Sequence, residues 1–221
     1  MDDTAAESRP YAGVSSEERH ARRRAALVEA GLELFGTRGY AASSVREICL
    51  AASLNRRYFY ESFRTREDLL RAVYDEITDE LSAALLEAVG AVDDIGSKIR
   101  VGMTVFWEVM ATDLRKARVL TIEMIGVSEE LERHRREVRH GFADFVAGQV
   151  LALAAAQNQA LRLDATLAAR GLVAATMDLV VDWMRGDVGY SLPELTEHCI
   201  RLYTIAGGAA FYDVEEPTAS D

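Results

Sequence analysis

The sequence predicts an all-α protein in which a small N-terminal helical bundle precedes a larger helical body. Three observations support this fold class. Helix start signals, in which a hydroxyl residue is followed three positions later by an acidic one, recur along the chain. Prolines stand only at positions 10, 193 and 217, so almost nothing between Val14 and Leu192 breaks a helix. No stretch alternates apolar and polar residues for long enough to form a strand.

The charge of the chain is unevenly distributed. Its 221 residues carry a formal net charge of -11, which alone argues against a nucleic-acid partner. Residues 15–72, however, contain eleven arginines against eight acidic residues, whereas residues 73–221 contain thirteen basic and twenty-five acidic residues. A basic front on an acidic body indicates a polyanion-binding module attached to a domain with another role.

Composition and cysteine usage indicate in which cellular compartment the protein resides. Apolar residues make up 49% of the chain, which is enough to bury a sizeable core. Cys49 and Cys199 lie far apart without a CxxC spacing, a pattern that favours buried thiols in a reduced compartment. The N-terminus lacks the apolar core of a secretory signal, and no run of eighteen apolar residues indicates a membrane span. We therefore expect a cytoplasmic protein that does not enter the membrane.

The front of the chain predicts three short helical elements and the start of a long one. A capping box at Ser15 opens the first helix, which should end near Gly39 because glycine readily takes the left-handed conformation there. A second box begins a short helix from about Ser44 to Ala51. After a three-residue turn, Asn55 is a good N-cap for the next helix, and a long helix follows Thr65.

The body predicts four further helices. Glycine and polar breaks separate segments at about 93–121, 128–156, 164–185 and 192–210. The predicted organisation is a flexible segment, a helix-turn-helix domain, a helical effector-binding and dimerisation domain, and an acidic tail. Their bounds are 1–14, 15–64, 65–211 and 212–221.

The stretch LNRRYFYESF at positions 54–63 is the most informative of the sequence. On a helix, Phe59 and Phe63 share one face and anchor it inward, whereas Arg56 and Tyr60 share another. Arginine forks read guanine in the major groove, and tyrosine hydroxyls hold phosphates. A short capped helix and a turn precede this segment, which favours a DNA recognition helix over a merely solvated basic helix.

Residues 19–78 resemble the DNA-binding domain of the tetracycline-repressor (TetR) family. The residues that carry the resemblance are ALVEAGLELFGTRGY at 26–40, SSVREICLAASLNRRYFYESF at 43–63 and TREDLLRAVYDEI at 65–77. The resemblance implies an all-helical homodimer that represses, or occasionally activates, genes. It also implies a near-palindromic double-stranded DNA operator and a C-terminal body that binds a small-molecule effector.

The resemblance carries over to some DNA-contacting positions and not to others. Tyr60 matches the family's phosphate-contacting tyrosine, Arg66 its basic residue at the start of the fourth helix, and Ser44 its hydroxyl at the second. Ser53 stands where the family often has glycine, and the recognition helix departs from the family pattern, so the operator cannot be carried over. The predicted DNA-binding residues are Ser44, Arg46, Asn55, Arg56, Arg57, Tyr58, Tyr60 and Arg66.

A basic run, Arg19, His20 and Arg22 to Arg24, opens the first helix. Two interpretations stay open. The run reaches phosphate or the minor groove, or it is a solvated surface paired with Glu17 and Glu18.

Methionine and aromatic residues recur at helical spacing in the body. Such a stripe is more often plain core than a ligand site, but the family resemblance implies that part of it encloses a pocket. The predicted effector-binding residues are Met103, Phe106, Trp107, Met110, Met124, Phe142, Phe145 and Met177.

The segment GLVAATMDLVVDWM at 171–184 is apolar nearly all round, so it should bury one face in its own body and another elsewhere. Its small side includes Gly171 and Ala175, and the helix after Pro193 has a comparable side. That second side consists of Cys199, Tyr203, Ala206, Gly207 and Ala210. We expect helices 164–185 and 192–210 to form a four-helix homodimer interface, as the resemblance also implies.

The sequence contains few features that would indicate another class of protein. It contains no nucleophile elbow, phosphate-binding glycine loop, HExxH or zinc-type cluster, so we expect neither an enzyme nor a metal or other cofactor. Glu130 with His134 is weak evidence for a metal site. The alternative to a regulator is an all-α ligand-binding or interaction protein that does not bind DNA.

Overall fold

A computed structural model describes residues 15–211, and the predicted N-terminal segment 1–14 and acidic tail 212–221 lie outside the described residues. Between those limits the backbone forms helices and loops and no strand, which confirms the all-α fold class. The elements are α1 Ser16–Thr37, α2 Val45–Ala51, α3 Arg56–Ser62, α4 Arg66–Gly90, α5 Ile95–Thr112, α6 Leu114–Arg118, the π-helical η1 Val119–Glu123, α7 Glu129–Ala156, α8 Ala165–Arg185 and α9 Leu192–Ala209.

Local signals set the ends of the first helices. Ser15 and Ser44 form the predicted capping boxes with Glu18 and Glu47, and Asn55 caps α3 by accepting from the Tyr58 N–H at 3.3 Å. The turn between α2 and α3 contains Ser53 at φ 54°, a left-handed conformation that a side chain adopts only under strain. The Leu54 N–H closes this turn on the Cys49 carbonyl at 2.8 Å.

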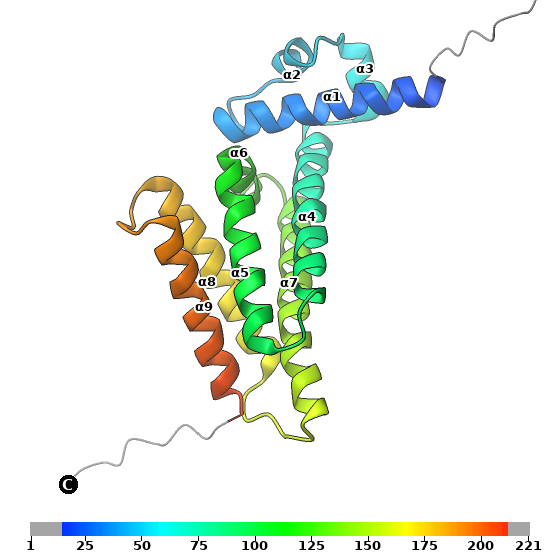
Figure 1. Cartoon of the computed structure of the whole chain (residues 1–221). Helices are drawn as coiled ribbons and strands as arrows, with labels where there is room; N and C mark the ends of the chain where they lie inside the picture. Colours follow the sequence, from blue (N-terminus) through cyan, green and yellow to red (C-terminus); the bar gives the residue numbers. More distant parts are fainter. Residues whose placement is uncertain (1–14, 212–221) are drawn as a thin grey trace, which may run out of the picture.

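Helix α4 connects the N-terminal bundle to the body. α1, α2 and α3 lie at one end of the molecule, and α4 runs from beneath them into the remaining helices (Figure 1). Its first turns bury Leu69 and Leu70 in the same core as Phe35 and Phe59. Its later turns bury Leu81 in the core of the body. One continuous hydrophobic core therefore joins the N-terminal bundle and the body. A displacement of α4 would change the packing in both parts.

The predicted helix 93–121 is wrong as a single element. The chain leaves the helical conformation at Asp113, which has φ -144° and ψ 99°. The Asp113 carboxylate accepts from the Arg115 N–H at 3.0 Å and so caps a new helix, α6, which continues into η1. Aspartate competes with the backbone for hydrogen bonds, which explains the break without proline or glycine.

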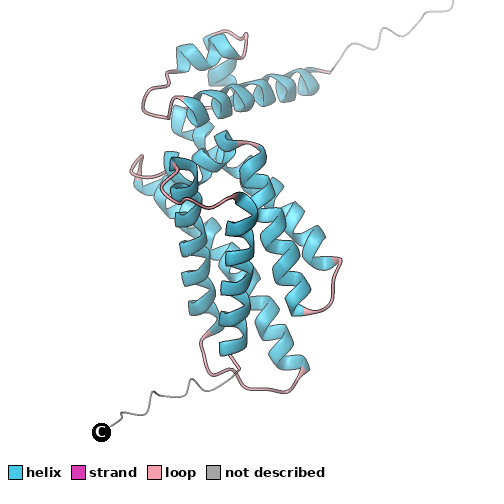
Figure 2. Ribbon diagram, turned by 60° about the vertical axis from the view of Figure 1, so that its left-hand side comes forward, coloured by secondary structure: helices cyan, strands magenta, loops and turns pink. Residues whose placement is uncertain are grey.

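The body consists of α5, α7, α8 and α9 alongside α4 (Figure 1), and Figure 2 shows the same bundle of helices from a second direction. α8 packs on α7 through small side chains, among them Ala143, Ala147 and Ala169, which allow the two backbones to approach closely. α9 lies against α5, where Cys199 is buried beside the body core. Among the residues that the structure describes, no helix has both the length and the apolar composition that crossing a membrane requires.

Candidate DNA-binding surface and effector cavity

The recognition helix α3 presents two different faces. Phe59 and Phe63 are buried and pack on each other with ring centroids 5.9 Å apart, which confirms their structural role. Arg56 and Tyr60 lie on the outer side, and the Tyr60 side chain is 59% exposed. Arg46 on α2 and the cap Asn55 are also exposed. These residues belong to α2, to α3 and to the cap of α3, and both helices lie at the end of the molecule farthest from the body (Figure 1).

Arg57 differs from its neighbour Arg56 because it has an intrahelical partner. Its Nε donates to the Glu61 carboxylate at 2.9 Å, and Arg23 from α1 lies 3.8 Å from the same carboxylate. Arg23 also stacks over the half-buried Tyr58 ring at 4.5 Å. A contact of Arg57 with DNA would therefore have to replace its ion pair with Glu61. The Arg56 side chain, in contrast, forms no hydrogen bond or ion pair within the described residues.

Part of the N-terminal basic run packs against α3. Arg24 lies over the Phe63 ring at 5.2 Å, and the His20 ring lies 3.4 Å from the Glu61 carbonyl at the end of α3. Together with Arg23, these residues connect α1 to the recognition helix. Neither of the two interpretations of this basic run included a contact with α3. In the structure its side chains pack against α3 and hold it in place.

Arg66 has a structural role in this conformation. Its guanidinium donates to the Tyr40 carbonyl at 3.0 Å and also to the Ser43 carbonyl, and it stacks on the Tyr40 ring at 4.1 Å. The side chain therefore ties the loop between α1 and α2 to α4. Both of these hydrogen bonds come from Nη1, so the Nε and Nη2 donors are left for other contacts, and a phosphate contact by Arg66 stays a prediction.

Ser44 and Glu47 form the cap of α2. The Ser44 hydroxyl donates to the Glu47 carboxylate at 2.7 Å, and the Ser44 N–H donates to it at 2.9 Å. These bonds, followed by one from Arg38, lower the pKa of Glu47 from 4.5 to about 2. The Ser44 hydroxyl is exposed at the helix start, where free N–H groups attract anions.

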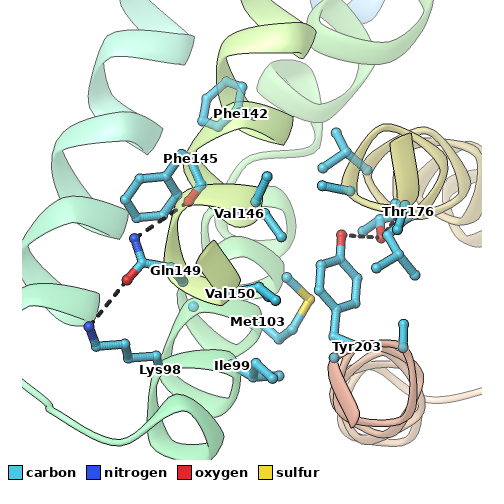
Figure 3. Close-up of a pocket in the computed structure, with 18 of the residues that line it drawn as sticks. Lys98, Ile99, Met103, Phe142, Phe145, Val146, Gln149, Val150, Thr176 and Tyr203 are labelled. Carbon is cyan, nitrogen blue, oxygen red and sulfur yellow. Dashed lines mark hydrogen bonds between the residues drawn. The ribbon is translucent and has the colours of Figure 1, made fainter. Parts of the chain in front are cut away.

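The body contains a partly open apolar cavity of about 120 Å³, lined by residues of α4, α5, α7, α8 and α9 (Figure 3). Five of the predicted effector-binding residues line it, namely Met103, Phe106, Phe142, Phe145 and Met177. Trp107, Met110 and Met124 do not line it. Each of these three is 0% exposed and packs in the core instead. Helical spacing alone did not separate wall residues from core residues, because both face inward.

Small side chains explain why the cavity exists. Ala206 and Gly207 of α9 and the following Ala210 line it, as do Ala165 and Ala168 of α8. Small residues either let helices approach or leave space unfilled, and here they leave space. Cys199, Tyr203 and Ala210 of the predicted small side are therefore buried within the protomer and do not meet a partner helix. Ala206 and Gly207 are half-buried, and dimerisation through α9 stays a prediction.

Four polar side chains interrupt the apolar wall, and none of them is among the effector-binding residues predicted from the sequence. Lys98 donates to the Gln149 side-chain oxygen at 3.2 Å, and Gln149 donates to the Phe145 carbonyl at 3.4 Å. On the other side of the view in Figure 3, the Tyr203 hydroxyl lies 3.1 Å from the Thr176 hydroxyl. Lys98 is detectable in the sequence, because it shares a helix face with Gly102 and Phe106 at four-residue spacing.

A polar junction joins the N-terminal bundle to the body. Arg115 of α6 forms ion pairs with Glu33 of α1 at 2.6 Å and with Asp113 at 2.7 Å. Arg118 donates to the Thr37 carbonyl at 2.9 Å, and the Tyr40 N–H donates to Glu123 at 2.7 Å. The end of α1 and its loop therefore rest on α6 and η1.

The close approach at this junction depends on glycine. A methyl group built on Gly36 would lie 2.7 Å from the Arg115 Cα, a distance at which backbone has to move. α1 can therefore approach α6 this closely only because residue 36 lacks a side chain.

The histidine that the sequence singled out has a different environment. His134 lies against Asp75 of α4 and packs edge-on against the Tyr74 ring at 5.9 Å, while Arg71 pairs with Glu130 at 3.4 Å. Between residues 15 and 211, no three His, Cys, Asp or Glu side chains are placed to hold a metal ion.

Comparison with known proteins identifies the N-terminal module. Residues 27–73 match the family described as "Bacterial regulatory proteins, tetR family", and they span the second half of α1, the helix-turn-helix and the start of α4. The protein is therefore a DNA-binding transcriptional regulator, and its DNA-binding domain belongs to the tetR family.

Known proteins also resemble the chain outside that module. The fatty acid metabolism regulator protein of Bacillus subtilis is 21% identical over 176 residues, which cover 80% of this chain and 91% of the relative. The crystal structure of the Bacillus subtilis regulator FadR in complex with stearoyl-CoA matches with a TM-score of 0.73 at 22% identity, over 81% of this chain and 96% of that one. FadR of Bacillus halodurans matches with a TM-score of 0.75 at 20% identity, over 86% and 97%. These similarities extend the tetR-type fold to the body.

Proposed function

We propose that the protein is a homodimeric repressor that leaves its operator when a long-chain acyl ligand, free or as a CoA thioester, enters the cavity of the body. The observation that carries this proposal is an apolar cavity with a single cation in its wall, in a body that is connected through α6 to the DNA-binding bundle.

The chemistry of the wall supports an amphipathic ligand. Lys98 is half-buried, and within residues 15–211 its ammonium group donates to the neutral Gln149 rather than to a carboxylate. A partly buried cation without a counter-ion favours an anionic group. The rest of the wall is almost entirely apolar, which suits an alkyl chain. The resemblance to fatty acid regulators, one of them bound to stearoyl-CoA, points to the same ligand class.

The exposed sides of α8 and α9 support a dimer. Gly171, Ala174 and Ala175 are exposed on α8, beside a Leu167 side chain that is 69% exposed. On α9, Ile205 is likewise 69% exposed. Small and apolar residues on two neighbouring helices suit a two-fold four-helix contact. A dimer would present two copies of α3 to successive major grooves of a near-palindromic site.

The junction between α1 and α6 connects ligand binding in the body to release of the protein from DNA. A ligand that spreads α5 from α7, α8 and α9 would move α6, and Arg115 and Arg118 would transmit that movement to α1. Coupling of this kind is typically about 1–3 kcal/mol, and it is reciprocal, so operator DNA weakens ligand binding by the same factor.

Fluorescence anisotropy with labelled DNA from upstream of the protein's own gene tests this function. We expect sequence-specific binding that stearoyl-CoA and stearate weaken and that CoA alone does not. Replacement of Lys98 by Met should reduce the effect of both acyl compounds while DNA affinity without ligand stays unchanged. Binding that is equal for this DNA and random DNA, or is insensitive to every acyl compound, would contradict the proposal.

A further inference from the structure

The wall of the cavity contains one pair of buried hydroxyl groups. Thr176 of α8 is 3% exposed and Tyr203 of α9 is 6% exposed, and both line the cavity. Their oxygens lie 3.1 Å apart. The cavity wall around them consists mostly of alanine, valine, leucine and methionine side chains.

Either hydroxyl of this pair could donate to the other, and the further bond of Thr176 to the backbone favours Tyr203 as the donor. The Thr176 hydroxyl donates its single proton to the Leu172 carbonyl at 2.9 Å, one turn earlier in α8. It can then only accept from Tyr203, so the Tyr203 hydroxyl donates its own proton to Thr176. Both protons are therefore used, and the phenolic oxygen keeps a lone pair that no other described residue satisfies.

Tyr203 also stays neutral. Burial raises the pKa of its hydroxyl to about 12, so the oxygen is an uncharged acceptor at ordinary pH. Its remaining lone pair lies in an apolar wall, where a hydrogen bond donated by a ligand is stronger than it would be in water. A ligand ammonium group would lose its hydration in this apolar wall. A ligand carbonyl is only an acceptor, so it cannot donate a hydrogen bond to the Tyr203 oxygen. A hydroxyl group fits both the polarity and the missing donor.

We infer that the cavity selects an acyl chain that carries a hydroxyl group along its length, with Tyr203 as the acceptor and Thr176 as the residue that sets the direction of its proton. The inference rests on the proposed function. The hydroxyl would lie away from the anionic end of the ligand, because Lys98 and Tyr203 stand on opposite sides of the cavity in Figure 3.

A set of C18 fatty acids tests this selectivity by isothermal titration calorimetry. Stearate, 10-hydroxystearate, 12-hydroxystearate and 12-ketostearate are compared on the wild type, Tyr203→Phe and Thr176→Val. At least one hydroxy acid should bind the wild type about tenfold more tightly than stearate, a ratio typical of one hydrogen bond formed in an apolar site. Tyr203→Phe should reduce that ratio to about one, because the acceptor is lost.

Thr176→Val tests the direction of the hydrogen bonds. Without the threonine oxygen, the Tyr203 proton is free to turn into the cavity, so 12-ketostearate should gain affinity relative to stearate. Tyr190→Phe is the matched control, because Tyr190 is 63% exposed and lies outside the cavity wall, and it should keep the wild-type ratios. Circular dichroism spectra of all variants establish that they are folded.

The outcomes separate this inference from the proposed function. Equal affinity of the wild type for stearate and every hydroxy acid, with release from DNA intact, overturns the hydroxyl selectivity alone. The same holds for a preference that persists in Tyr203→Phe. Absence of binding by all four acids and by stearoyl-CoA overturns both proposals.

Discussion

Arg56 and Arg57 are adjacent and chemically identical, yet the structure gives them different surroundings. Arg57 pairs with Glu61 at 2.9 Å, whereas Arg56 is exposed and has no such intramolecular pair among the described residues. An arginine that already has a carboxylate partner gains less from a base contact, because the existing ion pair must be broken first. Arg56 is therefore the better candidate for direct base readout.

Replacement of Arg56 by Ala should cost about 1–3 kcal/mol of operator affinity, with a smaller effect on random DNA, because a base contact carries sequence information. Arg57→Ala should cost less. Anisotropy titrations with operator and scrambled DNA at one salt concentration measure both variants. Equal losses on the two DNAs for Arg56→Ala would assign this residue to phosphate rather than to a base.

The cap of α2 makes the DNA-binding bundle sensitive to acid. The folded pKa of Glu47 is about 2, below its ordinary 4.5, so its contribution to stability is complete above about pH 4.5 and declines as the pH falls toward 2. Glu47→Gln should therefore be less stable than the wild type at pH 7, and the difference should shrink through this window. Thermal unfolding of both proteins at a series of pH values measures it. A difference that is the same at pH 7 and pH 2 would contradict the assignment.

Local signals in the sequence were enough for most helix boundaries. The capping boxes at Ser15 and Ser44 and the left-handed residue at Gly39 lie where the sequence predicted them, because caps depend only on neighbouring residues. The break at Asp113 escaped prediction, because an aspartate in the middle of an apolar helix is as compatible with continuation as with a new cap. The burial of Cys199, Tyr203 and Ala210 on the small side of α9 also escaped prediction, because small residues are equally suited to a close helix contact and to a cavity.

The dimer prediction now rests on the outer sides of α8 and α9. Ala175→Arg introduces a long charged side chain at an exposed position of α8, where it should split the dimer without loss of helical content. Ala83→Arg on the exposed side of α4 is a matched control that should leave the dimer intact. Light scattering at micromolar concentration measures both. A monomeric wild type, or a dimer undisturbed by Ala175→Arg, would contradict this interface.

In the whole molecule, the contact of α1 with α6 is the route that we propose for communication between the cavity and α3. The cavity itself could be located only from the structure, since Lys98 and Gln149 meet from helices α5 and α7 that are far apart in the sequence. The contact at Arg115 likewise joins residues that are distant along the chain. Neither arrangement has a local sequence signal, because both depend on how the helices pack.

Arg115→Met should leave the separate affinities for DNA and for stearoyl-CoA nearly unchanged and reduce their coupling from about 1–3 kcal/mol toward zero. Arg201→Met is a matched control, because Arg201 pairs with Glu197 on α9, away from α6. DNA titrations with and without saturating ligand give the coupling for each variant. Full coupling in Arg115→Met would show that the signal takes another route.

The contact at Gly36 limits how this regulator can be recombined with others. A chimera that joins its ligand-binding body to a foreign DNA-binding domain has to bring the end of the foreign first helix against Arg115, where a methyl group would lie 2.7 Å from the Cα. A donor domain with alanine or a larger residue at the equivalent position would be pushed away from α6. Such a hybrid sensor would still fold and bind DNA, but it would no longer respond to the ligand. Mutating that one position to glycine in the donor should restore the response.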